Sequence, residues 1–255
     1  MRRPHPIEIE SYRILRSRVD TTGLPPLTRA VVERVVHTTA DTTWTGDIVA
    51  DESALAAGRA ALLAGAPLVV DVRMVAAGIT SRPAIVALDL ATDDLTARRP
   101  TREAHGATGQ DAAAGDESAA ERTTRGPGGV AAGDESAAEG TTRGPGGVTR
   151  TAVGVRVAAR RWPDGAVWVI GNAPTALAEL VALASDGLVR PVLVVGMPVG
   201  FVGAVAAKAA LRASGLPAVS STTERGGAAV AAATVNALLY AEDNAEDFNA
   251  EDFDA

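Results

Sequence analysis

The sequence of 255 residues contains no cysteine, which excludes disulfide bonds, thiolate zinc sites and a cysteine nucleophile. Histidine is also scarce, because the three histidines, His5, His37 and His105, lie far apart in the chain. They leave little for an imidazole metal site, so we expect no bound metal. The patterns GxxxxGK[ST] and GxSxG are absent too, which argues against phosphoryl transfer and serine hydrolysis.

Long hydrophobic runs are missing as well. The longest apolar stretch, 192–207, is interrupted by Gly196, Pro198, Gly200 and Gly203. No basic segment followed by an apolar one stands at the N-terminus. We therefore expect a cytoplasmic protein without a membrane partner.

The formal charge of −7 is unevenly distributed along the chain. Residues 92–148 contain ten acidic residues and six arginines, and residues 241–255 contain seven acidic residues and no basic ones. The remainder has 18 basic and 14 acidic residues, a mildly basic balance that suits a polyanionic small molecule. Because no clustered stripe of Lys and Arg is present, we expect no nucleic-acid partner.

Two segments have low-complexity sequences. GDESAAERTTRGPGGVAA at 115–132 is followed directly by GDESAAEGTTRGPGGV, a tandem duplication with a period of 18 residues. Segments so poor in bulky apolar residues cannot offset the entropy of ordering, so 92–148 is predicted to be a disordered and dispensable insertion. The acidic repeats of 241–255 predict a solvated, disordered tail. With 47% apolar residues in the chain, 1–240 is expected to form a single domain around the insertion.

Outside these segments, short apolar runs alternate with longer amphipathic ones, as in an α/β protein. Continuous apolar strands between helices predict a mainly parallel five-stranded sheet that is covered on both faces. The predicted strands are Pro67–Val72, Ala84–Leu90, Ala166–Ile170, Val192–Val195 and Ala218–Ser220. The predicted helices are Glu10–Val19, Leu27–Thr38, Ser53–Ala64, Ala152–Arg161, Thr175–Ala184, Val202–Ala213 and Gly227–Leu239. Ligands bind beyond the carboxyl ends of the strands in such sheets, which directs attention to the strand-to-helix turns.

Two of these turns are rich in glycine. One runs from Gly171 to Thr175 and the other from Gly196 to Gly203, each between a predicted strand and a predicted helix. Exposed N–H groups and the positive end of a helix dipole make both turns natural carboxylate or phosphate sites, although any α/β fold needs glycines in such turns. The predicted ligand-binding residues in the turns are Asn172, Thr175, Gly196 and Gly200.

A dinucleotide site is the obvious competitor for the second turn. Its glycines follow the pattern GxxxGxxG, whereas the dinucleotide fingerprint is GxGxxG. About 20 residues after Gly200 the chain offers Val219, Ser220 and Ser221 where a ribose-binding acid is required. A nicotinamide-dependent oxidoreductase is therefore a low-ranking alternative for the function.

The predicted helix LTRAVVERVVHTTAD places Arg34 and His37 on one face, because the two residues are three positions apart. Glu33 and Asp41 lie one turn to either side of the histidine. An imidazole has an unperturbed pKa of about 6.5, so this face is a candidate site of proton transfer. A structural histidine that is satisfied by a neighbouring carboxylate is the alternative interpretation.

Several longer motifs resemble one family. HPIE, ESYRILRSRVD, VVHTTAD, AGAPLVVDVRMVAAGIT, VWVIGNAPTAL, VVGMPVGFVGAV and ERGGAAVAAATVNAL follow one another as in precorrin-8X and cobalt-precorrin-8 methylmutases. The resemblance covers everything except 92–148 and the tail. It implies a three-layer α/β/α domain, a homodimer and no cofactor.

The resemblance also implies an activity and a set of site residues. The reaction is an acid-assisted shift of a methyl group from carbon 11 to carbon 12 of a corrinoid ring, which gives hydrogenobyrinic acid or its cobalt counterpart. The catalytic histidine of the family corresponds to His37, and its substrate-binding serine and arginine correspond to Ser11 and Arg34. A second arginine matches Arg150 in TRTAVG.

The sequence departs from the family pattern at two places. Ala206 and Ala207 replace an acid and a serine before Lys208, and Ser221–Thr223 replaces Asn-Arg-Ser. Both departures weaken the assignment of that side of the pocket. A non-catalytic carrier of corrinoids is the alternative to the enzyme, and no residue in the sequence decides whether the substrate contains cobalt.

Overall fold

The computed structural model describes residues 5–91 and 148–241. The predicted insertion and acidic tail lie almost entirely outside these residues, so both stay predictions. No helix within the described residues is long and apolar enough to span a bilayer.

A single sheet organises the described part of the chain, with the strand order β1-β6-β5-β4-β2-β3. All neighbouring strands are parallel except β1, which runs antiparallel to β6 at one edge. The strands are β1 (Ile48–Ala50), β2 (Leu68–Val70), β3 (Ile85–Val86), β4 (Val167–Ile170), β5 (Leu193–Gly196) and β6 (Ala218–Ser221). The carboxyl ends of the five parallel strands therefore meet at one edge of the sheet, where ligands bind in folds of this kind.

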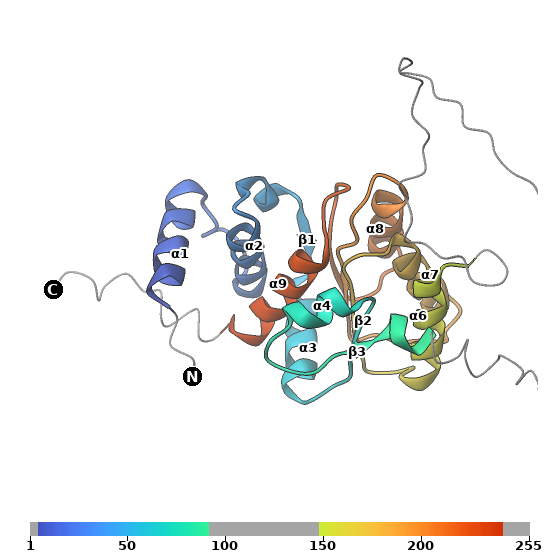
Figure 1. Ribbon diagram of the computed structural model, residues 1–255. Helices are drawn as coiled ribbons and strands as arrows, with labels where there is room; N and C mark the ends of the chain where they lie inside the picture. Colours follow the sequence, from blue (N-terminus) through green and yellow to red (C-terminus); the bar gives the residue numbers. More distant parts are fainter. Residues whose placement is uncertain (1–4, 92–147, 242–255) are drawn as a thin grey trace, which may run out of the picture.

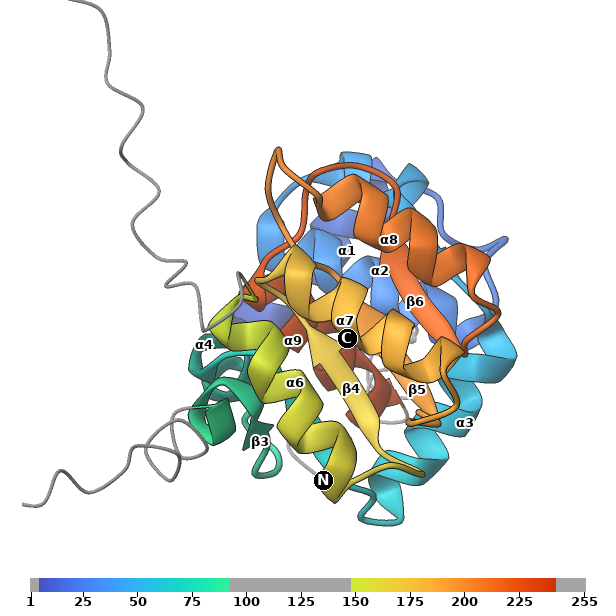
Figure 2. The same ribbon diagram turned by 90° about the vertical axis from the view of Figure 1, so that its right-hand side faces the viewer.

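Helices cover both faces of the sheet and make three layers (Figure 1). One face carries α2 (Pro26–Thr39), α3 (Glu52–Leu63), α4 (Arg73–Gly78) and α9 (Ala228–Leu239), with α1 (Pro6–Arg18) outside α2. The other face carries α6 (Arg150–Arg161), α7 (Pro174–Ser185) and α8 (Ala204–Ala213), seen from the front in Figure 2. A short 3₁₀ helix, η1 (Thr42–Gly46), follows α2. The predicted three-layer α/β/α domain is confirmed.

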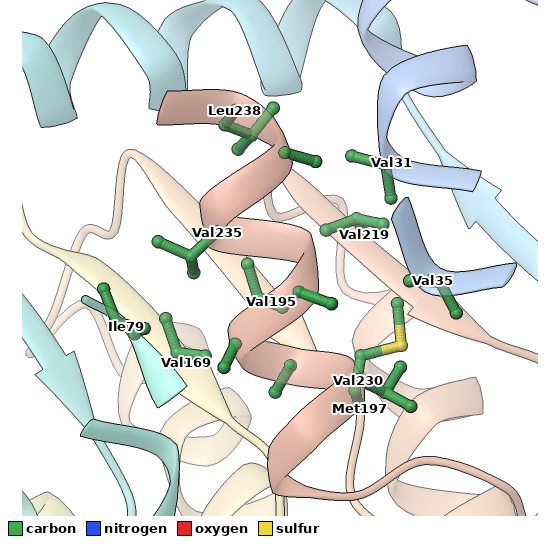
Figure 3. Close-up of a cluster of buried hydrophobic side chains, with 14 of the residues drawn as sticks. Val31, Val35, Ile79, Val169, Val195, Met197, Val219, Val230, Val235 and Leu238 are labelled. Atoms are coloured by element: carbon green, nitrogen blue, oxygen red, sulfur yellow. The ribbon is translucent and has the colours of Figure 1, made fainter. Parts of the chain in front are cut away.

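The core lies in two layers because successive strand residues point to opposite faces of the sheet. Val169, Val195 and Val219 pack beneath α9, and Figure 3 shows them with Val230 and Val235 of that helix. The alternating residues of the same strands join the second cluster, which lies beneath α6 and α7. Burial on both faces explains why the strands are continuous apolar runs in the sequence.

Three details differ from the sequence-based prediction. The sheet has a sixth strand, β1, whose three apolar residues are too short a run to be distinguished from a loop. The predicted strand Ala84–Leu90 is wrong beyond Val86, because residues 87–91 are helical. Short apolar runs fit a strand or a buried helical turn equally well, and here the sheet pairs only with Ile85 and Val86. Helix α4 also escaped prediction, since six residues carry too little periodicity.

Candidate functional site

His37 lies in the last turn of α2, and two residues of α1 hold its ring. The Oγ atom of Ser11 lies 2.8 Å from Nδ1 of His37. The ring of Tyr12 stacks on the imidazole with centroids 4.8 Å apart and planes inclined by 12°. One contact fixes the hydrogen bonding of Nδ1 and the other fixes the plane of the ring, so Nε2 is the nitrogen left for a ligand.

Helix α1 stays on α2 through both apolar and charged contacts. Tyr12 and Leu15 are buried against the domain. Arg16 forms an ion pair with buried Glu33 at 2.8 Å, and Thr21 donates a hydrogen bond to the same carboxylate at 2.6 Å. These contacts place Ser11 over the end of α2. They also show that the carboxylate of Glu33 is bound by Arg16 and Thr21.

Arg34 brings a positive charge to this arrangement. Its Nη1 atom donates to Oε1 of Glu8 at 2.7 Å and lies 3.5 Å from the hydroxyl of Tyr12. Partial burial lowers the pKa of His37, the positive charge of Arg34 lowers it further, and Glu8 opposes both effects. A lowered pKa makes the imidazolium a stronger acid, which suits a group that lends a proton to its ligand.

The partner of His37 is therefore a hydroxyl and not a carboxylate. The two acids that flank the histidine in the sequence are engaged elsewhere, because Asp41 pairs with Arg225 at 2.5 Å while Glu33 binds Arg16. When the ring is protonated, Nδ1–H donates to Ser11 and Nε2–H can donate to a substrate. The geometry thus favours proton transfer over a histidine satisfied by an adjacent acid.

A cavity of about 750 Å³ opens at the carboxyl end of the parallel strands on the face of α6, α7 and α8. It contains three of the predicted substrate-binding residues, Arg150, Asn172 and Thr175. The remaining lining is small and mostly apolar: Val72, Leu88, Thr149, Thr151, Ala173, Pro174, Ala178, Val202, Gly203, Ala206, Ala207 and Ala210. Ala206 and Ala207, where the sequence departs from the family pattern, are thus lining residues.

Three helices begin at the rim of this cavity. Thr149 caps α6 by accepting from the backbone N–H of Ala152, and its hydroxyl lies 2.8 Å from that of Thr175 in the first turn of α7. Gly203 precedes the first residue of α8 with a φ of 79°, in the left-handed region. Three helix N-termini and Arg150 make this a favourable place for the negative charges of a ligand.

The turn after β4 uses its N–H groups within the protein. Asp71, which follows β2, is fully buried and accepts hydrogen bonds from the backbone N–H groups of Gly171, Asn172 and Ala173 at 2.8–3.1 Å. A ligand carboxylate cannot bind these groups at the same time. The backbone of this turn thus has an acceptor inside the protein, while Asn172 and Thr175 line the cavity and stay predicted ligand-binding residues.

The turn after β5 is held by neighbouring loops. Gly200 donates its N–H to the carbonyl of Glu224 at 3.0 Å, and buried Lys208 donates to Ser221 Oγ and Arg225 O. Gly196 is buried in β5, where a Cβ atom would lie 2.4 Å from Leu211, so its missing side chain serves packing. Neither Gly196 nor Gly200 lines the cavity.

The residues that depart from the family pattern in the loop after β6 also form hydrogen bonds within the protein. Thr222 and Thr223 both donate to the carboxylate of Asp47, and Arg225 adds a contact at 3.2 Å. These donors outweigh burial and lower the pKa of Asp47 to about 2. Desolvation lowers the pKa of Lys208 to about 8. This charged network holds the loop of Glu224 and Arg225, which in turn contacts the turn after β5.

The structure thus places six of the eight predicted site residues in two groups and leaves Gly196 and Gly200 outside both. Ser11, Arg34 and His37 lie together, and Arg150, Asn172 and Thr175 lie together in the cavity, whose lining contains none of the first three. Within the described residues, no group of three His, Asp or Glu is placed to hold a metal ion. Sequence reasoning missed Glu8, Tyr12 and Asp71. The spacing of Glu8, Ser11 and Tyr12 on one helix was the available signal for the first two.

Comparisons with known proteins agree on one family. The model of the family CbiC, precorrin-8X methylmutase, matches residues 6–126 and 112–241. A precorrin-8X methylmutase from Pseudomonas aeruginosa is 34% identical over 90% of this chain and 91% of its own length. A cobalt-precorrin-8 methylmutase from Synechocystis is 30% identical over 92% of this chain and 94% of its own.

A solved structure supports the same conclusion. The precorrin-8X methylmutase of Thermus thermophilus superimposes with a TM-score of 0.68 at 28% identity, over 93% of this chain and 96% of the other. The family model covers both the group of Ser11, Arg34 and His37 and the residues that line the cavity. The chain therefore belongs to the precorrin-8X methylmutase family.

Proposed function

We propose that this protein is a precorrin-8X methylmutase, an isomerase of cobalamin biosynthesis that moves a methyl group from carbon 11 to carbon 12 of a corrinoid ring. The methyl group leaves one carbon and joins its neighbour in the same molecule, so no atoms are gained or lost. The proposal includes metal-free and cobalt-containing substrates, since relatives of both names match this chain. A cytoplasmic location remains part of the proposal.

The observation that carries the proposal is the way in which Ser11 and Tyr12 hold His37. A methyl shift around a conjugated ring needs no nucleophile. It needs a proton or a strong hydrogen bond that redistributes charge in the ring, and a rigid orientation of the ring. With Nδ1 bound to Ser11, His37 can lend a proton from Nε2 and take it back after migration.

The cavity supplies the second requirement, which is orientation. Its volume of about 750 Å³ is in the usual range for sites that bind organic ligands. The substrate carries several peripheral carboxylates, and these suit the guanidinium of Arg150 and the N-termini of α6 and α8. Asn172 and Thr175 add neutral hydrogen-bonding groups on the same wall.

The direct test is a single-turnover experiment with an excess of protein over the metal-free or the cobalt-containing precursor. We expect the absorbance spectrum of the precursor to change to that of the corrin product, because methyl migration alters the conjugation of the ring. Mass spectrometry should show an unchanged mass. Binding without a spectral change would contradict the enzyme and indicate a carrier.

We propose further that the protein is a homodimer whose site is completed by both protomers. The loop beside the cavity exposes large apolar side chains, with Phe201 95% and Val202 89% accessible to solvent. Such side chains, clustered with partly exposed Val199 and Val205, are typical of an interface. The separation of the His37 group from the cavity supports the same idea, since a second protomer can bring one group to the other.

The dimer proposal predicts the behaviour of Phe201→Asp. The variant should be monomeric by sedimentation, and its turnover should fall by about 10²-fold because part of each site is then missing. Leu188→Asp is the matched control, since Leu188 is also exposed but precedes β5, whereas the cavity opens beyond the carboxyl ends of the strands. A monomeric Phe201→Asp protein with full turnover would refute the shared site.

A further inference from the structure

Asp71 is a fully buried carboxylate that accepts four hydrogen bonds from backbone N–H groups of the described residues. Its Oδ1 accepts from Val72 N at 3.0 Å and Gly171 N at 3.1 Å. Its Oδ2 accepts from Asn172 N at 2.8 Å and Ala173 N at 2.9 Å. Both oxygens are thus saturated by two segments that lie about a hundred residues apart in the chain. Burial raises the pKa of Asp71, and the backbone donors oppose that effect.

The groups that Asp71 binds are walls of the cavity. Val72, Asn172 and Ala173 line it, and so does Leu88, whose backbone N–H donates to the carbonyl of Asp71 at 3.2 Å. Asp71 itself has no exposed surface and does not line the cavity. One buried residue therefore joins the segments after β2, β3 and β4 around the ligand space.

We propose that Asp71 is a positioning residue for substrate binding, which holds Asn172 and the first turn of α7 in the geometry that receives the corrinoid. This inference rests on the proposed function, because it takes the cavity to be the substrate site. Asp71 does not touch the substrate. It acts through the backbone of the residues that do.

The chemistry of the turn explains why a carboxylate is required. The residue before α7, Ala173, has no side chain that can cap the helix, and Asp71 instead accepts the backbone N–H groups of the three residues that lead into it. An asparagine has the same shape but only one acceptor oxygen, so two of the four N–H groups would lose their acceptor and face an NH₂ group. Gly171, one of the donors, is itself held by close packing, because a Cβ atom at this position would lie 2.8 Å from Val75 and from Ala231.

The test compares Asp71→Asn with the wild type and with Asp164→Asn, an exposed aspartate before β4 that pairs with Arg190. We expect Asp71→Asn to weaken affinity for the corrin product by about 10- to 100-fold, because two buried donors are unpaired and the turn shifts. Turnover at saturating substrate should change by less than about threefold, and its pH profile should not move, because His37 is untouched. Asp164→Asn should behave as the wild type.

Hydrogen exchange of the backbone amides shows whether the affinity is lost for the proposed reason. In Asp71→Asn, the amides of 171–173 should lose protection while those of β4 keep it. Asn172→Ala provides the complementary variant, with weaker affinity and retained protection, since its backbone N–H still reaches Asp71. If the two substitutions act through the same contact, the double variant binds no worse than the weaker single one.

Each other outcome identifies what has failed. A wild type that neither binds nor converts the precursor refutes the proposed function. The positioning role alone is refuted if the wild type binds the product and Asp71→Asn binds it equally well although the amides of its turn have lost protection. If Asp71→Asn does not fold, hydrogen exchange of the wild-type protein tests the proposal instead. Amides 171–173 must be protected without ligand, and protection that appears only with product would overturn the proposal.

Discussion

His37→Ala is expected to lower the rate of rearrangement at saturating substrate by about 10²- to 10⁴-fold, the usual contribution of a positioned acid or base. Affinity for the product should largely survive, because Arg34 and the cavity remain. The reason is geometric, since Ser11 at 2.8 Å fixes Nδ1 and leaves Nε2 as the group that can reach a substrate. Single-turnover absorbance measures the rate, and titration with product measures the affinity.

Two substitutions in α1 serve as controls for this result. Tyr12→Phe keeps the stacked ring and removes only the hydroxyl 3.5 Å from Arg34, so it should keep most of the activity. Ser11→Ala should slow the reaction less than His37→Ala, because the acid remains but its ring is less well held. Near-normal single-turnover rearrangement by His37→Ala would eliminate the acid role and leave His37 a structural residue.

Arg34→Gln should show the opposite balance between affinity and rate. A hydrogen bond to a charged group contributes about 1.5–3 kcal/mol, so losing one to a substrate carboxylate should weaken product affinity by about 10- to 150-fold. The rate at saturation should fall much less, because His37 is intact. Equal losses in rate and affinity would contradict an orienting role for Arg34.

The same variant should move the pH profile in a known direction. The acid form of His37 is required, so the rate is highest below its pKa and falls as pH rises through it. The positive charge of Arg34 lowers this pKa and Glu8 raises it. The fall should therefore occur at higher pH in Arg34→Gln and at lower pH in Glu8→Gln. Shifts of the same sign in both variants would show that this pKa does not belong to His37.

The sequence predicted the elements whose pattern is long and local. A parallel sheet between helices follows from the apolar runs of β2, β4, β5 and β6 and from the amphipathic pattern of α2. Both signals are local, because the spacing of apolar residues along a segment indicates whether it is a strand or a helix. The pairing of Arg34 with His37 on one face follows from the same periodicity. The pattern failed at β1, α4 and residues 87–91, where three to six residues are too few to distinguish a strand from a helical turn.

The sequence by itself determined the family, the fold class and the identity of the candidate acid, since these depend on motifs and local periodicity. The tertiary structure decided which groups meet. It placed Ser11 on His37 across 26 residues, turned Glu33 and Asp41 to other partners, and filled the turn after β4 with Asp71. Contacts between segments far apart in the chain depend on how the layers pack, and no local pattern encodes that packing.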